Sequence, residues 1–378
     1  MVDRVAGVCH GVTYPAIILQ FLPSAHTRIG IILTTAQIEK NIAWLLSNGS
    51  APVKYLTHKY LLKTRRSQLM KGLWEDVEIC QDAQDILGKQ EKDGSWYAGG
   101  SWSLKPSYIG KEGYDPFNPK YVTTVWVLPI LGEMGFTVQD RRIRKACNYV
   151  LSHGYFLDPI FSAPTANLKA DDVRFSPCRF SQYLVALGKV GLTDDVCVQK
   201  GYKVLVSLQR DDGGWALQQH IIERNWTRSC PVSSYHATLA LYCSKNRRYK
   251  DRLTKALKFL VWHLSTKKDD ELRRFFYHGH NTVHELLMFS EHQIGLEEKA
   301  IQTILEWLMM MYRAAEGCFK YIGKPISKYS NQEDGMDARV AKYRLYHVIE
   351  DDWLTYYMTR IGANLLDKQF AAQSPHTG

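Results

Sequence analysis

Pairs of adjacent aspartates are the first candidates for acid–base chemistry in this chain of 378 residues. Asp194-Asp195 precedes a helical pattern and is explained as an N-cap, and Asp211-Asp212 belongs to a repeated phrase described below. Asp171-Asp172 and Asp351-Asp352 remain as candidate catalytic acids. Asp351-Asp352 ranks first because aromatic residues, beginning with Trp353, follow on the same predicted helix. The structural alternative is a solvated acid pair at a helix start, where carboxylates are favoured.

A histidine-rich segment offers ligands for a metal ion. His280 and His284 are one helical turn apart, so both imidazoles can reach one metal, and zinc is an ion that such ligands hold. Cys230 and His236 lie one repeat earlier and are further candidates. The alternative is a set of histidines hydrogen-bonded at a helix start without a metal. We therefore predict that no cofactor is required and keep zinc as the alternative.

Aromatic residues make up 12% of the chain, and several lie in short apolar segments. They either line a cavity for an apolar molecule or fill that cavity. The candidate cavity and ligand-binding residues are Trp126, Tyr183, Tyr235, His236, Tyr242 and Arg344.

Helices must position all of these residues. Apolar residues recur at i, i+3, i+4 and i+7 in segments such as 143–151 and 301–312, which predicts amphipathic helices. More apolar segments alternate with them, at 121–133, 180–189, 233–244 and 282–291. The connection after each apolar segment is short and the one before it is long. Long loops therefore gather at one end, beside the N-termini of the apolar helices, and there we expect the chemistry.

Two amphipathic segments end in the same phrase, Gln90-Glu-Lys-Asp93-Gly94-Ser95-Trp96 and Gln209-Arg-Asp-Asp212-Gly213-Gly214-Trp215. Gly94, Gly154 and Gly214 are spaced by sixty positions, and Glu316-Gly317-Cys318-Phe319 is a weaker match. The phrase resembles the repeat of terpenoid cyclases and protein prenyltransferase β-subunits, and the resemblance covers about residues 52–366. It implies that the glutamine caps helix ends, that the tryptophan packs on the neighbouring repeat, and that the motif is structural.

We predict an all-α protein, an α/α toroid built from helical hairpins. It is an α6/α6 barrel if the first and last helices pair. Residues 1–34 form an N-terminal segment, residues 35–366 form a single toroid domain, and residues 367–378 form a disordered tail.

The resemblance implies a terpenoid-cyclase-like or prenyltransferase-like protein with an isoprenoid or other apolar ligand in its central cavity. The cyclases carry an Asp-x-Asp-Asp acid motif that this chain lacks, so the acid falls to Asp351-Asp352 or Asp171-Asp172. One alternative is a non-catalytic toroid that binds protein or lipid. Another is a metal-dependent or carbohydrate-active α/α barrel, in which paired acids flank a sugar.

Charge and cysteine content bound the partners and the compartment. The formal net charge is +10, and the basic stretches 54–71 and 245–258 favour a solvated helix face or a peripheral membrane contact. No nucleic-acid reading module is recognisable, so we expect no nucleic-acid partner. Eight cysteines without CxxC pairs, and the lack of a signal-peptide pattern, predict a cytoplasmic protein. The apolar runs 16–22 and 29–33 are shorter than the ~20 residues that span a bilayer.

Overall fold

The structure is a computed structural model that describes residues 33–96, 124–152, 176–216, 227–277, 280–321 and 351–373, with side chains left out at 276–277, 280 and 367–373. The chain divides into Met1–Gly30 and Ile31–Gly378, and every described residue belongs to the second unit. The described residues are mostly helical, which confirms the predicted all-α class. None of the helices in this part of the chain is long and apolar enough to cross a membrane.

The helices are α1 (Thr35–Asn48), α2 (Ala51–Leu56), η1 (Thr57–Leu61), α3 (Ser67–Ile79), α4 (Gln81–Leu87), α5 (Thr124–Met134), α6 (Arg141–Leu151), α7 (Pro177–Lys189), α8 (Val196–Ser207), α10 (Pro231–Ser244), η6 (Arg247–Tyr249), α11 (Lys250–Ser265), α12 (Asp269–Leu272), α13 (Thr282–His292), α14 (Lys299–Met309) and α16 (Asp351–Gln373). Two antiparallel pairs of short strands join β1 (Phe276–Tyr277) to β2 (His280–Asn281) and β3 (Tyr312–Arg313) to β4 (Cys318–Phe319). Helix α16 continues past Leu366, where the sequence places the end of the domain.

Caps and glycines set the boundaries of the hairpins. Asp140 caps α6, and Asp195 caps α8 by accepting a 2.8 Å hydrogen bond from the Cys197 backbone N–H, so the predicted N-cap at Asp194-Asp195 is confirmed. Gly135 follows α5 with φ of 107°, and Gly191 follows α7 with φ of 84°. Only glycine takes these angles at little cost, so both residues end their helices as the sequence predicts.

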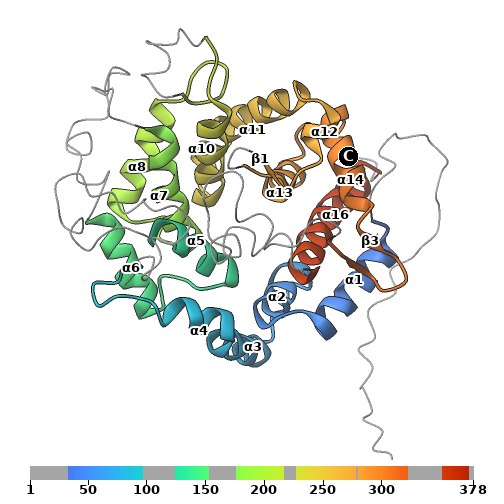
Figure 1. Ribbon diagram of the computed structural model, residues 1–378, viewed down its shortest axis with the longest axis horizontal. Helices are drawn as coiled ribbons and strands as arrows, with labels where there is room; N and C mark the ends of the chain where they lie inside the picture. Colours follow the sequence, from blue (N-terminus) through green and yellow to red (C-terminus); the bar gives the residue numbers. More distant parts are fainter. Residues whose placement is uncertain are drawn as a thin grey trace, which may run out of the picture. The chain divides into compact units, whose positions relative to one another are not determined.

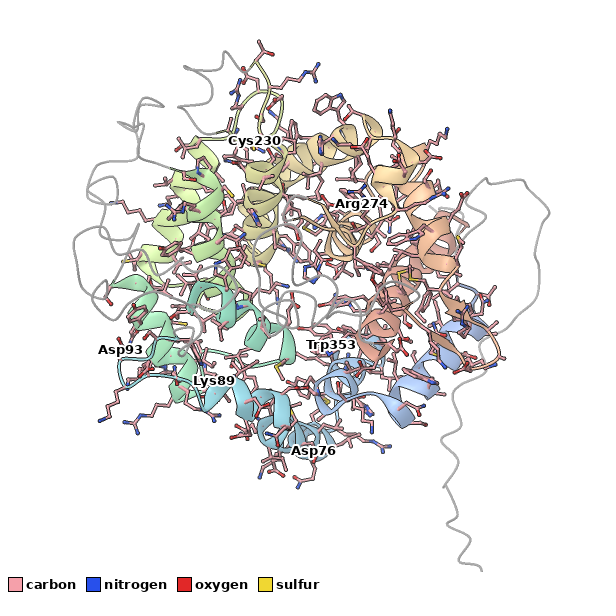
Figure 2. The ribbon with its side chains drawn as sticks, in the orientation of Figure 1. Asp76, Lys89, Asp93, Cys230, Arg274 and Trp353 are labelled. Carbon is pink, nitrogen blue, oxygen red and sulfur yellow. The ribbon has the colours of Figure 1, made fainter. Side chains whose placement is uncertain are left out.

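The repeated phrase ties one hairpin to the next. The Gln90 side chain donates to the Gly94 carbonyl (3.0 Å) and to the Arg142 carbonyl in α6 (2.9 Å). The Trp96 indole N–H donates to the Ile86 carbonyl at 2.7 Å, inside the hydrophobic core. Asp93 of this copy is labelled in Figure 2.

The second copy repeats these bonds. Gln209 donates to the Gly213 carbonyl (2.8 Å) and to the Arg252 carbonyl in α11 (2.9 Å). Trp215 donates to the Leu205 carbonyl at 2.7 Å. The glutamine therefore joins the end of one amphipathic helix to the start of the next, and the phrase has the structural role that the sequence assigns to it.

A third copy follows α14 and reaches the first helix of the chain. The Phe319 backbone N–H donates to the Thr355 hydroxyl of α16 (2.8 Å), as the Trp215 N–H donates to Ser234. A Cβ on Gly317, whose φ is 77°, would lie 3.1 Å from the Lys40 carbonyl oxygen in α1. Helix α1 therefore contacts the phrase that follows α14 in the same way that α11 contacts the phrase that follows α8.

The sixty-residue spacing pairs the wrong glycines. Gly94 and Gly213 have φ of 97° and 90°, and each lies against the backbone of a lysine in the following amphipathic helix. Gly214 has no positive φ and packs on Ser229 instead. The equivalent of Gly94 is therefore Gly213, and Gly154 lies outside the described residues.

The apolar helices contact one another in chain order. Helix α2 contacts α5, α5 contacts α7, α7 contacts α10, α13 contacts α16, and α16 contacts α2. A 2.6 Å hydrogen bond from the Tyr242 hydroxyl to Glu291 joins α10 to α13. The first and last described helices, α1 and α16, pack side by side and are blue and red in Figure 1. Helices α6, α8 and α11 pack on α5, α7 and α10, so these three apolar helices have the amphipathic partners that the sequence predicts.

Removing one glutamine of the repeated phrase tests its contribution. We expect Gln209→Ala to lower the free energy of unfolding by about 1–2 kcal/mol, because two hydrogen bonds are lost, and Gln90→Ala to have a similar effect. Urea denaturation measures the change. Gln139→Ala, at an exposed glutamine, is the control and should leave stability unchanged. Equal values for Gln209→Ala and Gln139→Ala would contradict the role of the motif.

Candidate functional site

Glu133, near the end of α5, gathers polar side chains from three other helices. Its Oε1 lies 2.7 Å from Lys189 Nζ of α7 and 3.3 Å from His284 Nε2 of α13. Its Oε2 accepts a 3.2 Å hydrogen bond from the Tyr357 hydroxyl of α16. The rest of α5 is apolar and packs in the core, so the Glu133 side chain is only 8% exposed. A carboxylate held there needs these partners.

A second carboxylate in the same region has a matching set of partners. Arg360 of α16 forms an ion pair with Glu291 of α13 and donates to the Tyr356 hydroxyl at 3.3 Å. Tyr242 of α10 donates to Glu291 at 2.6 Å. The Arg360 guanidinium lies 4.7 Å over the ring of Tyr60, which comes from η1. Elements η1, α5, α7, α10, α13 and α16 therefore all contribute to one polar cluster.

We call this set the central cluster. Its members are Tyr60, Glu133, Lys189, Tyr242, His284, Glu291, Tyr356, Tyr357 and Arg360. Several members come from the last turns of their helices, as Glu133, Lys189 and Glu291 do. These three residues lie at the short-connection ends of their helices, whereas His284 lies in the first turn of α13, at the long-loop end where the sequence places the chemistry.

Burial and charge set the protonation of the cluster. Burial is the largest single effect on the pKa of Lys189 and lowers it, but Glu133 and Cys243 together outweigh burial and raise the pKa, so this lysine stays charged. Burial, reinforced by Glu133, raises the pKa of Tyr357 well above its ordinary value. Tyr357 is therefore a hydrogen-bond donor to Glu133 at every physiological pH.

His284 is the one histidine of the cluster. Burial lowers its pKa to about 4, against the opposing effect of Glu133, so the imidazole is neutral at pH 7. The 3.3 Å approach to Glu133 is therefore not an ion pair, although both residues carry titratable groups. Nε2 is buried, and it makes no hydrogen bond of good geometry within the described residues. Its ring packs edge-on against Tyr357, with centroids 5.4 Å apart.

The predicted acids Asp351 and Asp352 lie at the start of α16 and bind backbone. Asp351 accepts a 3.1 Å hydrogen bond from the Tyr321 N–H, and Asp352 accepts one of 2.8 Å from the Ser50 N–H, at the start of α2. Trp353, which follows them and is labelled in Figure 2, is 1% exposed. Both carboxylates thus fix the N-terminus of α16 to neighbouring segments.

The predicted cavity residues fall into different environments. Tyr183 and Tyr235 are buried in the hydrophobic core, and Trp126 is half-buried against that core. His236 is buried, forms a short hydrogen bond with Gln182, and packs edge-on against Tyr235. Among the members of this set that the structure describes, Tyr242 alone joins the central cluster.

The described residues do not fit a zinc site at His284. The carboxylate oxygen nearest to its Nε2 is already bound by the Lys189 ammonium at 2.7 Å, so a cation there would face a second positive charge. Within the described part of the chain no group of three His, Cys, Asp or Glu side chains could hold a metal ion. The side chain of His280 lies outside the described residues, as do Asp171, Asp172 and Arg344.

The sequence carried one signal for the central cluster. Glu133 is the one charged residue of the apolar helix α5, and a charged residue in such a helix needs a buried partner. Which partner it has could not be read, because Glu133 and Tyr357 are 224 positions apart.

The chain matches no family model, no curated protein sequence and no solved structure.

Proposed function

We propose that the chain is a terpenoid-cyclase-like α/α toroid that binds an isoprenoid-like apolar molecule through one uncharged polar group, held at the central cluster. The repeated phrase supports the family resemblance, because both copies make the same bonds. The toroid is supported by the order of helix contacts, which runs from α2 through α5, α7, α10, α13 and α16 back to α2. The contact of α1 with α16 and the close approach of Gly317 to Lys40 of α1 support a sixth hairpin made by the first and last helices.

His284 is the observation that carries the ligand proposal. A buried polar atom without a hydrogen bond is costly and rare in proteins. A ligand atom that forms a hydrogen bond with Nε2 of His284 would remove this cost. A neutral imidazole pairs with a hydroxyl or a carbonyl. The Tyr357 ring of α16 packs against the His284 imidazole and the Tyr356 ring packs against Tyr357, and such aromatic neighbours suit an apolar molecule with a single polar group.

The charge of the cluster favours an uncharged ligand group. Lys189 pairs with Glu133, and Arg360 pairs with Glu291, so the four formal charges cancel. Both cations are 19% exposed in their side chains and remain close to solvent. An anionic ligand would have to compete with the two carboxylates for these cations. We therefore expect an alcohol or a ketone rather than a diphosphate.

If the protein is an enzyme, the cluster takes up a proton rather than supplying one. A neutral imidazole beside a carboxylate is a base, whereas the start of a cyclisation needs a protonated acid in a dry site. Asp351 and Asp352 already accept backbone hydrogen bonds that hold the start of α16. An initiating acid therefore falls to Asp171-Asp172 among the candidates of the sequence.

Lipid extraction of the purified full chain, followed by mass spectrometry, tests the ligand class. Titration with a fluorescent prenyl alcohol then measures its affinity. We expect His284→Phe to raise the dissociation constant about 10-fold, the value of one buried hydrogen bond. His263→Phe is the matched control, since His263 is a buried histidine on the amphipathic helix α11. It should leave the affinity unchanged.

Two results would contradict the proposal. The first is extraction of no apolar molecule together with no prenyl alcohol binding by a folded protein. The second is equal affinity of His284→Phe and the unsubstituted chain. Binding without turnover of any prenyl substrate would instead support the non-catalytic toroid.

A further inference from the structure

The outer surface of α11 and the η6 turn before it is strongly basic. Seven exposed lysines and arginines lie between residues 245 and 258, against one acid, Asp251. Within the described residues none of the seven forms an ion pair. The seven are Lys245, Arg247, Arg248, Lys250, Arg252, Lys255 and Lys258.

The repeat motif fixes which side of α11 faces out. Its apolar residues, such as Leu253, Leu257 and Leu260, are buried. The carbonyls of Arg252 and Lys255 meet the second copy of the motif, in which Gln209 donates to Arg252. The exposed basic side chains of α11 therefore lie on the side of the helix that faces solvent.

An exposed tryptophan continues the basic face. Lys255, Lys258 and Trp262 are spaced i, i+3 and i+7, which places them on one side of α11. Trp262 is 38% exposed. The Arg228 guanidinium lies 4.3 Å over its ring, and the Phe259 ring packs against it at 5.5 Å. The indole is held in place at the surface by these two contacts.

We propose that this face of α11 binds the surface of an anionic lipid membrane. Clustered lysines and arginines are attracted to anionic headgroups, and tryptophan is favoured at the level of the headgroups. A nucleic acid would use the same cations but would stack its bases on an open aromatic face. Arg228 and Phe259 already contact the Trp262 ring, so the membrane is the better fit.

Helix α6 offers a matched control. It receives Gln90 at the Arg142 carbonyl as α11 receives Gln209 at the Arg252 carbonyl, so the two helices hold equivalent places in the repeat. It also exposes three cations, Arg141, Arg144 and Lys145, and it contains no tryptophan. Substituting these three cations removes the same charge as substituting three cations of α11, Arg252, Lys255 and Lys258.

The experiment is co-sedimentation of the full chain with vesicles of phosphatidylcholine containing one quarter phosphatidylserine, or of phosphatidylcholine alone. We expect binding to the anionic vesicles only. Three headgroup contacts are lost in the triple variant Arg252→Gln, Lys255→Gln, Lys258→Gln, and its affinity should fall about 100-fold. The triple variant Arg141→Gln, Arg144→Gln, Lys145→Gln should bind within about 3-fold of the unsubstituted chain.

The outcomes separate the surfaces and the partners. Equal losses in the two triple variants would show an effect of net charge and overturn the α11 site, as would equal binding to neutral vesicles. Retention of a single-stranded RNA oligonucleotide that is lost only in the α11 variant, without vesicle binding, would overturn the membrane in favour of nucleic acid. The vesicles contain no isoprenoid, so this test does not depend on the proposed ligand.

Discussion

Replacing Lys189 with methionine should lower the free energy of unfolding by about 3 kcal/mol. The variant keeps most of the lysine stem but removes the charge 2.7 Å from Glu133. Glu133 is only 8% exposed, so its carboxylate would lose its counterion where water cannot fully replace it. Urea denaturation at pH 7, read as the change in midpoint at constant slope, measures the loss.

The double variant Lys189→Met, Glu133→Gln separates a lost charge partner from a lost packing contact. We expect it to recover most of the stability of the unsubstituted chain, because glutamine leaves no buried charge and still accepts from the Tyr357 hydroxyl. The two single changes would then be strongly non-additive. If the double variant were as unstable as the sum of the singles, the buried ion pair would not explain the cost of Lys189→Met.

The helices were predictable because their signals are local. The i, i+3, i+4 spacing lies within one segment. Asp195 marks a helix start through its side-chain cap, and Gly135 and Gly191 mark helix ends through their positive φ. The repeated phrase was also readable as structural, since Gln90 and Gln209 precede the same turn. The sixty-residue interval misleads because the glycine with positive φ is the one that directly follows the aspartate of the phrase, Gly94 in one copy and Gly213 in the other.

The central cluster was not predictable in the same way. Its pairs join residues far apart in the chain, such as Tyr242 with Glu291 and Arg360 with Tyr60. Helix dipoles favour chemistry at the N-termini of the apolar helices. At the N-terminus of α16, however, Asp352 accepts a hydrogen bond from the backbone N–H of Ser50. The partners of Glu133, Lys189 and Glu291, at the C-terminal ends of their helices, depend on which helices are neighbours. The residue pattern within one helix does not predict its neighbours.

Acidification from pH 6.5 to pH 4 should destabilise the protein through His284. Burial lowers its folded pKa to about 4, whereas an unfolded histidine titrates near 6.5. Below pH 6.5 the unfolded state therefore takes up a proton that the folded state refuses, and stability falls as the pH falls through this window. The difference of 6.5 − 4 corresponds to about 3 kcal/mol at 1.36 kcal/mol per pKa unit. Above pH 6.5 His284 is neutral in both states, so none of this stability is lost.

His284→Gln isolates this effect, because glutamine cannot titrate and retains an N–H that can face Glu133. His58 and His292, whose pKa values burial also lowers, titrate equally in both proteins. The free energy of unfolding of the unsubstituted chain minus that of His284→Gln should therefore decrease steadily as the pH falls from 6.5 towards 4. Parallel curves would show that His284 is protonated at its ordinary pKa. Because a neutral imidazole is what the proposed ligand meets, prenyl alcohol affinity should also stay constant from pH 8 to about pH 5 while the protein remains folded.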